Sequence, residues 1–203
     1  MWTLQIIKKS LVGFFCFIVH CYVITKRSAE PKELSLVYVD DRYTNFLQAN
    51  GDHRVSKNNN VDYQRPFIGV LFRIDEFLYF APLTTHSKGK RLRDHPKAEN
   101  ITFYPIENCK YGGVNFNNMI PLIKGTFKEI DMIIKPDDFG WERNKKLQLI
   151  NIKRILRHEG KYLISKAVNL YSLKTKGVLY SNYDKITCDF KKLEQVAKTY
   201  KSS

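Results

Sequence analysis

Two runs of hydrophobic residues separated by a polar pair form the clearest pattern along the chain. The runs cover residues 67–74 and 77–83, are rich in β-branched and aromatic residues, and flank Asp75-Glu76. Two such runs joined by a polar dipeptide are typical of a β-hairpin. Thr84 and Thr85 follow the second run directly, so the predicted strand delivers two hydroxyl groups to the loop that comes next.

Shorter hydrophobic runs predict three further strands, at residues 34–39, 101–106 and 114–123. The last run is interrupted by polar residues and contains Pro121. Because proline cannot donate a hydrogen bond within a sheet, it favours an edge strand or a bulge there.

Helical spacing of hydrophobic residues predicts four helices. The first follows Asp40 and ends near residues 50–51. The second follows residues 135–138 and ends at residues 159–160, and the third continues from there to about residue 173. The fourth spans residues 189–201. Strands therefore come first and helices later, which indicates an α+β domain with a compact antiparallel sheet or barrel core and flanking helices.

The first 32 residues are set apart by an apolar block at residues 11–24. Fourteen residues are short for a membrane span, which needs ~20, and suit the hydrophobic segment of a signal peptide. An Ala-x-Ala cleavage site is missing, and a third interpretation is that residues 1–32 are upstream sequence read in frame. We expect one domain at residues 33–203 after this leader.

The charge of the chain indicates a polyanionic partner. The formal net charge is +14, and +10 remains when residues 1–32 are left out. Such an excess suits nucleic acid or an anionic membrane surface, although a merely soluble basic protein is an alternative. The hydrophobic content of 43% excludes general disorder.

The four cysteines stand at positions 16, 21, 109 and 188, without a CxxC pair or zinc-ligand spacing. We expect Cys109 and Cys188 to be reduced and partly buried in a cytosolic protein. The sequence has no glycine-rich nucleotide fingerprint and no GxSxG or HExxH motif.

The residues after the hairpin suit RNA cleavage without a metal ion. That reaction uses the 2′-hydroxyl of the RNA as nucleophile and needs groups that hold the phosphate, transfer protons and stabilise charge. Thr84 and Thr85 can donate to phosphate oxygens, Lys88 can supply positive charge, and Tyr43 and Tyr63 can stack on bases or donate a proton.

Structural roles are the alternative for each of these residues. Tyr43 lies on the apolar face of its helix, the threonines can cap a turn, and the cations can form a solvated surface. His86 and His95 can act as acid or base, but a histidine in a basic loop is usually a surface residue. Residues 137, 138 and 142 are acidic, and capping of a helix explains them better than metal binding.

Five ordered segments resemble the ToxN/AbiQ endoribonucleases of type III toxin–antitoxin and phage abortive infection systems. The segments are Tyr43, residues 63–70 (YQRPFIGV), residues 79–85 (YFAPLTT) with Lys88, residues 115–121 (NFNNMIP) and residues 188–194 (CDFKKLE). The resemblance runs from about residue 34 to residue 200 and so covers nearly all of the chain after the leader.

This resemblance implies a sheet domain similar to the Kid and MazF toxins and an endoribonuclease in the cytoplasm. It implies metal-independent cleavage of cellular or phage mRNA to a 2′,3′-cyclic phosphate and a 5′-hydroxyl, with no cofactor. It also implies inhibition by an RNA antitoxin of pseudoknot repeats in an oligomeric protein–RNA complex. The implied catalytic residues are Tyr43, Tyr63, Thr84, Thr85 and Lys88. The expected RNA-binding residues are Arg65, Ser87, Lys90, Arg91, Arg93, Lys97, Asn117 and Asn118.

The loop departs from the family pattern Thr/Ser-Ser-Pro-Lys, since residues 84–88 read Thr-Thr-His-Ser-Lys. The extra residue leaves open whether Lys88 or Lys90 is the functional lysine and whether Ser87 replaces a hydroxyl. It also raises a proton-transfer role for His86. Two rival functions are a non-catalytic RNA-binding partner and a basic protein tethered to a membrane through residues 11–24.

Overall fold

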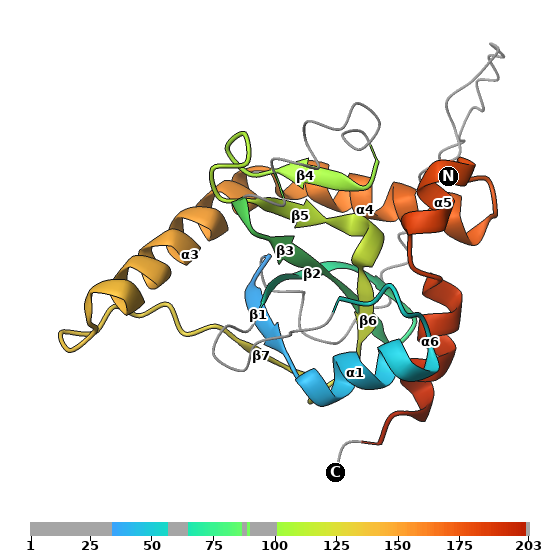
Figure 1. Ribbon diagram of the computed structural model, residues 1–203, viewed down its shortest axis with the longest axis horizontal. Coiled ribbons are helices and arrows are strands. Elements are labelled where there is room, and N and C mark those ends of the chain that lie inside the picture. Colours follow the sequence, from blue (N-terminus) through green and yellow to red (C-terminus); the bar gives the residue numbers. More distant parts are fainter. Residues whose placement is uncertain (1–33, 57–64, 87–88, 90–100, 202–203) are drawn as a thin grey trace, which may run out of the picture. The chain divides into compact units, whose positions relative to one another are not determined.

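The predicted hairpin lies at the centre of the sheet in the computed structural model, which describes residues 34–56, 65–86, 89 and 101–201 (Figure 1). Strand β2 spans Pro66–Ile74 and β3 spans Phe77–Thr84, with Phe67 opposite Pro82 and Ile74 opposite Phe77. Asp75 in the turn has a φ of 50°, a left-handed conformation that aspartate tolerates. The hairpin prediction is confirmed.

Five shorter strands complete the described sheet, and every pairing is antiparallel. They are β1 (Leu36–Val39), β4 (Phe103–Pro105), β5 (Gly113–Asn115), β6 (Ile120–Leu122) and β7 (Phe127–Glu129). The order is β4-β5-β3-β2-β1-β7, and β6 pairs with β3 beside β5. The 3-10 helix η1 (Phe116–Asn118) divides the run predicted as one strand, which places Pro121 in a short strand on β3.

The four predicted helices are confirmed, and a fifth short one precedes the last. The described helices are α1 (Asp41–Asn50), α3 (Gly140–His158), α4 (Gly160–Thr175), α5 (Ser181–Ile186) and α6 (Phe190–Thr199). Asp40 caps α1 by accepting a hydrogen bond from the Arg42 amide at 2.8 Å. Asp189 caps α6 in the same way through the Lys192 amide at 3.0 Å. Together with the antiparallel sheet, these helices confirm the α+β class.

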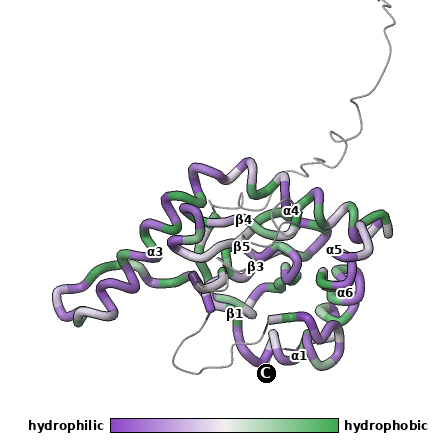
Figure 2. The backbone as a smooth tube through the Cα atoms, turned by 45° about the horizontal axis from the view of Figure 1, so that its top comes forward, coloured by the Kyte–Doolittle hydropathy of each residue, from purple (hydrophilic) through white to green (hydrophobic). Residues whose placement is uncertain are grey.

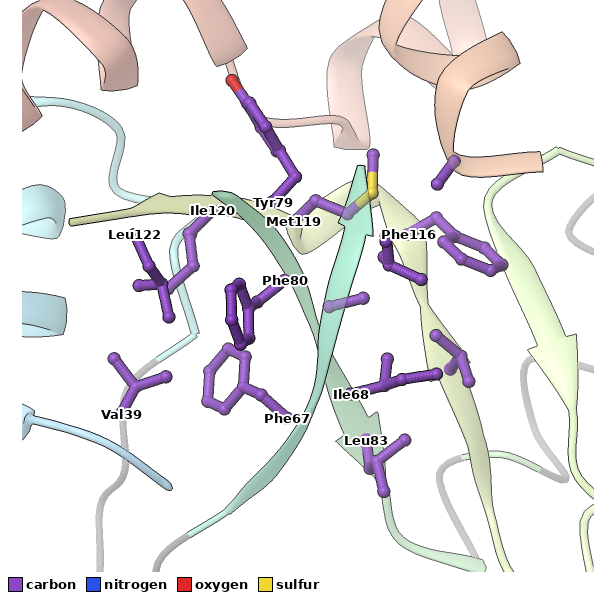
Figure 3. Packing of buried hydrophobic residues seen from close by; sticks show 14 of the residues in the cluster. Val39, Phe67, Ile68, Tyr79, Phe80, Leu83, Phe116, Met119, Ile120 and Leu122 are labelled. Carbon is purple, nitrogen blue, oxygen red and sulfur yellow. The ribbon is translucent and has the colours of Figure 1, made fainter. Parts of the chain in front are cut away.

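Both faces of the hairpin are buried. Figure 3 shows Phe67 and Phe80 side by side with Leu122 nearby, whereas Ile68 and Leu83 extend from the same two strands on the other side. Helix α4 packs against β2, and α6 packs against β6. In Figure 2 hydrophobic and hydrophilic segments alternate along α3, as expected for a helix with one buried stripe.

A buried acid joins the sheet to two helices. The Tyr79 and Tyr171 hydroxyls both donate to Glu194 Oε1, at 2.8 and 2.7 Å, and Lys191 Nζ lies 2.9 Å from Oε2. These bonds connect β3, α4 and α6. Because a buried carboxylate is costly without partners, the set favours one arrangement of these elements.

A second buried acid, Asp52, holds the turn after α1 against the segment before α6. Its carboxylate accepts hydrogen bonds from Arg54 Nη2 at 2.6 Å and from the Asp189 amide at 2.7 Å. Arg54 Nη1 in turn donates to the Lys185 carbonyl at 2.9 Å. Burial opposes ionisation, but the hydrogen bonds from Arg54 and Asp189 outweigh it and lower the pKa of Asp52 to about 2.

Asp52→Asn is therefore expected to lower the free energy of unfolding at pH 7 by about 2.5 kcal/mol. Because the folded pKa lies below the unfolded value of ~3.9, the ionised carboxylate stabilises the fold above that pH and loses its effect as the pH falls through the folded value. Urea unfolding should show the difference between wild type and variant narrowing from about pH 4 to about pH 2. The exposed Asp75→Asn should change stability little, and an equal loss in both variants would contradict the role of Asp52.

The predicted leader 1–32, its apolar block and the domain boundary lie outside the described residues. Across the part of the chain that is described, no helix is long and apolar enough to cross a membrane. Neither Cys109 nor Cys188 forms a disulfide within the described residues, and both are fully buried, whereas partial burial was predicted.

Candidate active site at the end of strand β3

The two predicted threonines lie where β3 leaves the sheet. Thr84 pairs with Gly113 of β5, is 7% exposed, and donates from its hydroxyl to the Gly113 carbonyl at 3.3 Å. Thr85 is exposed, and its carbonyl accepts the Gly89 amide at 2.8 Å, as in one helical turn. The structure therefore places one hydroxyl against the sheet and the next one at the surface.

Gly112 allows a second segment to lie against this strand end. Its φ is +79°, and a Cβ added there would lie 1.9 Å from the Thr84 carbonyl oxygen. An atom of that size cannot fit without moving the backbone of β3. The loop of residues 106–112 can therefore contact Thr84 and Thr85 closely because residue 112 is glycine.

A histidine completes the described part of this strand end. His86 follows Thr85 and is exposed, and its Nδ1 lies 2.6 Å from the carbonyl oxygen of Cys109 in the neighbouring loop. Two threonines and a histidine therefore occupy three consecutive positions at this strand end.

Arg65 is the predicted RNA-binding cation that the structure describes. It precedes β2, and since Phe67 lies opposite Pro82, Arg65 lies near the end of β3 where the threonines follow. Arg65 is partly buried, and this burial lowers the pKa of its guanidinium, which remains a cation at neutral pH.

Most of the predicted basic loop lies outside the described residues. This holds for the catalytic candidates Tyr63 and Lys88, for the RNA-binding candidates Ser87, Lys90, Arg91, Arg93 and Lys97, and for His95. Their sequence positions remain the basis for their predicted roles.

Tyr43 is in the core, and the structure does not support its predicted catalytic role. The residue is fully buried, its hydroxyl donates to the Pro121 carbonyl at 2.6 Å, and its ring packs edge-on against Tyr200. Burial raises the pKa of this phenol. Pro121 pairs with Tyr79, five residues before Thr84 and so about 16 Å away along an extended strand. We therefore assign Tyr43 a structural role.

Asn118 also has a structural role in place of the predicted RNA contact. Its amide nitrogen donates to the Arg54 carbonyl and to Cys188 Sγ, and its Oδ1 accepts from the Asn115 side chain at 2.7 Å. Asn117 donates to the Ile186 carbonyl at 2.8 Å. Both amides hold the chain around η1 through bonds to backbone carbonyls far away in the sequence.

Asp138, considered above for metal binding, accepts hydrogen bonds from the Lys135 amide at 2.8 Å and from Lys146 Nζ at 2.5 Å. Both bonds lower the pKa of its carboxyl, the bond from Lys146 being the larger cause. Within the described ranges no group of three or more His, Cys, Asp or Glu residues could hold a metal ion. The acid therefore stabilises the start of α3.

A cationic hollow beside α3 was not predicted from the sequence. Its volume is about 350 Å³. The lining residues are Met132, Ile150, Lys153, Arg154 and Arg157. From helical spacing alone the three cations look like an ordinary solvated surface of α3. The hollow forms only when Met132, from the segment before α3, lies beside them. Cations around an apolar floor can hold an anion such as a phosphate group.

Sequence comparison assigns the family. A family model described as toxin ToxN of type III toxin–antitoxin systems matches residues 35–198. The chain belongs to the ToxN family. The resemblance drawn from the five segments is thereby confirmed.

Two curated ToxN relatives are similar along most of their length. Endoribonuclease ToxN of Bacillus thuringiensis subsp. kurstaki is 26% identical over 167 residues, which cover 80% of this chain and 82% of the relative. Endoribonuclease ToxN of Pectobacterium atrosepticum is 26% identical over 165 residues, which cover 77% of this chain and 88% of that relative.

Solved structures share the ToxN fold. AbiQ, a lactococcal anti-phage endoribonuclease of a type III system, has a TM-score of 0.65 at 20% identity and covers 83% of this chain and 98% of its own. A toxin from a study of selective inhibition by a non-coding RNA pseudoknot has a TM-score of 0.66 at 23% identity. The match covers 84% of this chain and 99% of that chain. A third structure comes from work on a processed non-coding RNA that regulates a bacterial antiviral system. Its TM-score is 0.67 at 21% identity, and the match covers 83% of this chain and 100% of that chain.

Proposed function

We propose that this ToxN-family toxin is an endoribonuclease that cleaves single-stranded RNA without a metal ion. The observation that carries the proposal is the end of β3, where the exposed Thr85 and His86 follow the buried Thr84 and lead directly into the basic loop. The strand end thus presents hydrogen-bond donors, and a run of cations follows them in the sequence, which together suit in-line attack on a phosphodiester.

The proposed reaction is attack of the 2′-hydroxyl on the adjacent phosphorus, which gives a 2′,3′-cyclic phosphate and a 5′-hydroxyl. The Thr85 hydroxyl donates to a non-bridging phosphate oxygen, and Lys88 stabilises the charge that builds up on the phosphorane. Tyr63 stacks on a base or donates a proton to the departing oxygen. Thr84 holds the strand end through its bond to Gly113.

The proposed partner and inhibitor is an RNA antitoxin with pseudoknot repeats. One structural relative was studied in selective inhibition by a non-coding RNA pseudoknot. The charge of +10 after residue 32 and the hollow lined by Lys153 and Arg154 provide cations for such an RNA. We propose an oligomeric complex of protein and RNA in the cytoplasm, with cellular or phage mRNA as the substrate of the released toxin.

The test is to incubate the purified protein with single-stranded RNA in EDTA and to analyse the ends of the products. We expect fragments that carry a 2′,3′-cyclic phosphate at one end and a 5′-hydroxyl at the other. RNA that is bound but stays intact would indicate a non-catalytic RNA-binding protein. Cleavage that requires added Mg²⁺ would exclude the metal-independent reaction.

A further inference from the structure

The contact between His86 and Cys109 determines which ring nitrogen of the histidine carries a proton. Its Nδ1 lies 2.6 Å from the Cys109 carbonyl oxygen. A carbonyl oxygen can only accept a hydrogen bond, so Nδ1 must be the donor. In the neutral imidazole the lone pair that can accept a proton is then on Nε2.

The loop that supplies this carbonyl is held in an unfavourable conformation. Glu107, Asn108 and Cys109 have φ values of 44°, 52° and 69°. Left-handed backbone costs roughly 1–2 kcal/mol per non-glycine residue, somewhat less for asparagine. Such strain persists only where the surrounding structure imposes it, and it occurs preferentially at functional sites.

The same loop is fixed from both sides, so the carbonyl has a defined direction. The Cys109 carbonyl also accepts the Gly112 amide at 3.0 Å, and the Cys109 side chain is fully buried. Gly112 brings the loop against Thr84. The acceptor for His86 is therefore held in place by a hydrogen bond and by packing against the strand end.

The other side of the His86 ring is open to a ligand. The residue is exposed, and no hydrogen bond from Nε2 is found within the described part of the chain. A histidine that served packing alone would be buried. Here one nitrogen is anchored and the other lies on the opposite side of the ring, in the residue that follows Thr85, which is the arrangement of an oriented general base.

We propose that His86 is the general base of the cleavage reaction, an inference that rests on the proposed ribonuclease function. Nε2 takes the proton of the 2′-hydroxyl as the bond from O2′ to phosphorus forms. The bond from phosphorus to O5′ breaks, and O5′ takes a proton from Tyr63 or from water. The imidazolium then returns its proton to water, so the enzyme is regenerated with no net change in protons.

The decisive variants separate catalysis from anchoring. His86→Asn keeps an N–H donor near the position of Nδ1, so it can retain the bond to Cys109, but it lacks the basic Nε2. We expect kcat for RNA cleavage to fall about 10²–10³-fold, with the Kd for a non-cleavable 2′-O-methyl RNA and the unfolding midpoint unchanged. Wild-type activity in His86→Asn would overturn the proposal, because it would show that only the anchor matters.

Two further measurements assign the step. In His86→Ala, added imidazole should restore cleavage in proportion to its concentration, which a purely structural role would not allow. An RNA with sulfur in place of the departing O5′ needs no general acid, because the thiolate leaves without a proton. If His86 is the base, His86→Asn should therefore lose as much activity relative to wild type on this RNA as on ordinary RNA. Recovery on the sulfur substrate would make His86 an acid and contradict the proposed base. An inactive wild-type protein would instead refute the ribonuclease function itself.

Discussion

Gly112→Ala is expected to abolish RNA cleavage and to lower the free energy of unfolding by about 4 kcal/mol. The new Cβ would lie 1.9 Å from the Thr84 carbonyl oxygen and 2.9 Å from the Thr84 carbonyl carbon. Both are backbone atoms, so relief requires the loop to leave β3. The positive φ of +79° adds the cost of left-handed alanine. Urea unfolding and a cleavage assay measure the two effects.

Gly177→Ala is the matched control. Gly177 has a similar φ of +69°, but nothing lies within 4 Å of its added Cβ. It should lose only about 1 kcal/mol and should keep full cleavage activity. If Gly112→Ala were no worse than Gly177→Ala, the close approach between the loop and the strand end would be wrong.

Lys88→Ala is expected to reduce cleavage about 10²–10³-fold and to relieve growth arrest on expression, with folding unchanged. The physical reason is that the phosphorane carries more negative charge than the bound RNA, so a positioned cation lowers the barrier more than it tightens binding. The measurement is kcat alongside the Kd for a non-cleavable RNA. We expect kcat to fall much more than the affinity.

Lys90→Ala and Lys124→Ala are the controls for this prediction. Lys90 is the alternative that the departure from the family pattern leaves open, and Lys124 is an exposed lysine between β6 and β7. Full toxicity in Lys88→Ala with loss in Lys90→Ala would move the role by two positions. Equal small losses in all three would indicate that only net charge matters.

The elements that were predicted correctly are those whose pattern of hydrophobic residues is visible in the local sequence, without knowledge of tertiary contacts. The hairpin shows as two hydrophobic runs around Asp75-Glu76, and α6 as a stripe with a capping Asp189. Strand β7 and helix α5 are too short for the spacing of their hydrophobic residues to indicate a strand or a helix. The run at residues 114–123 divides because the side chains of η1 bond to distant segments, which a local pattern cannot reveal.

The candidate site was predictable only in part for the same reason. The position of Thr84 and Thr85 follows from where the hydrophobic run ends. The resemblance to ToxN placed Tyr43 in the site, whereas its helical spacing already favoured the core in which it lies. The bond between His86 and Cys109 joins residues 23 positions apart through a left-handed turn, so only the fold shows it.

A single-atom change in the RNA tests attack by the neighbouring ribose most directly. Once the cleaved linkage is mapped, the nucleotide on its 5′ side is replaced by the 2′-deoxy form and the reaction is repeated in EDTA. We expect cleavage at that linkage to disappear while the RNA still binds with the same Kd. Undiminished cleavage of the 2′-deoxy RNA would show that another nucleophile attacks the phosphate and would contradict the mechanism at its first step.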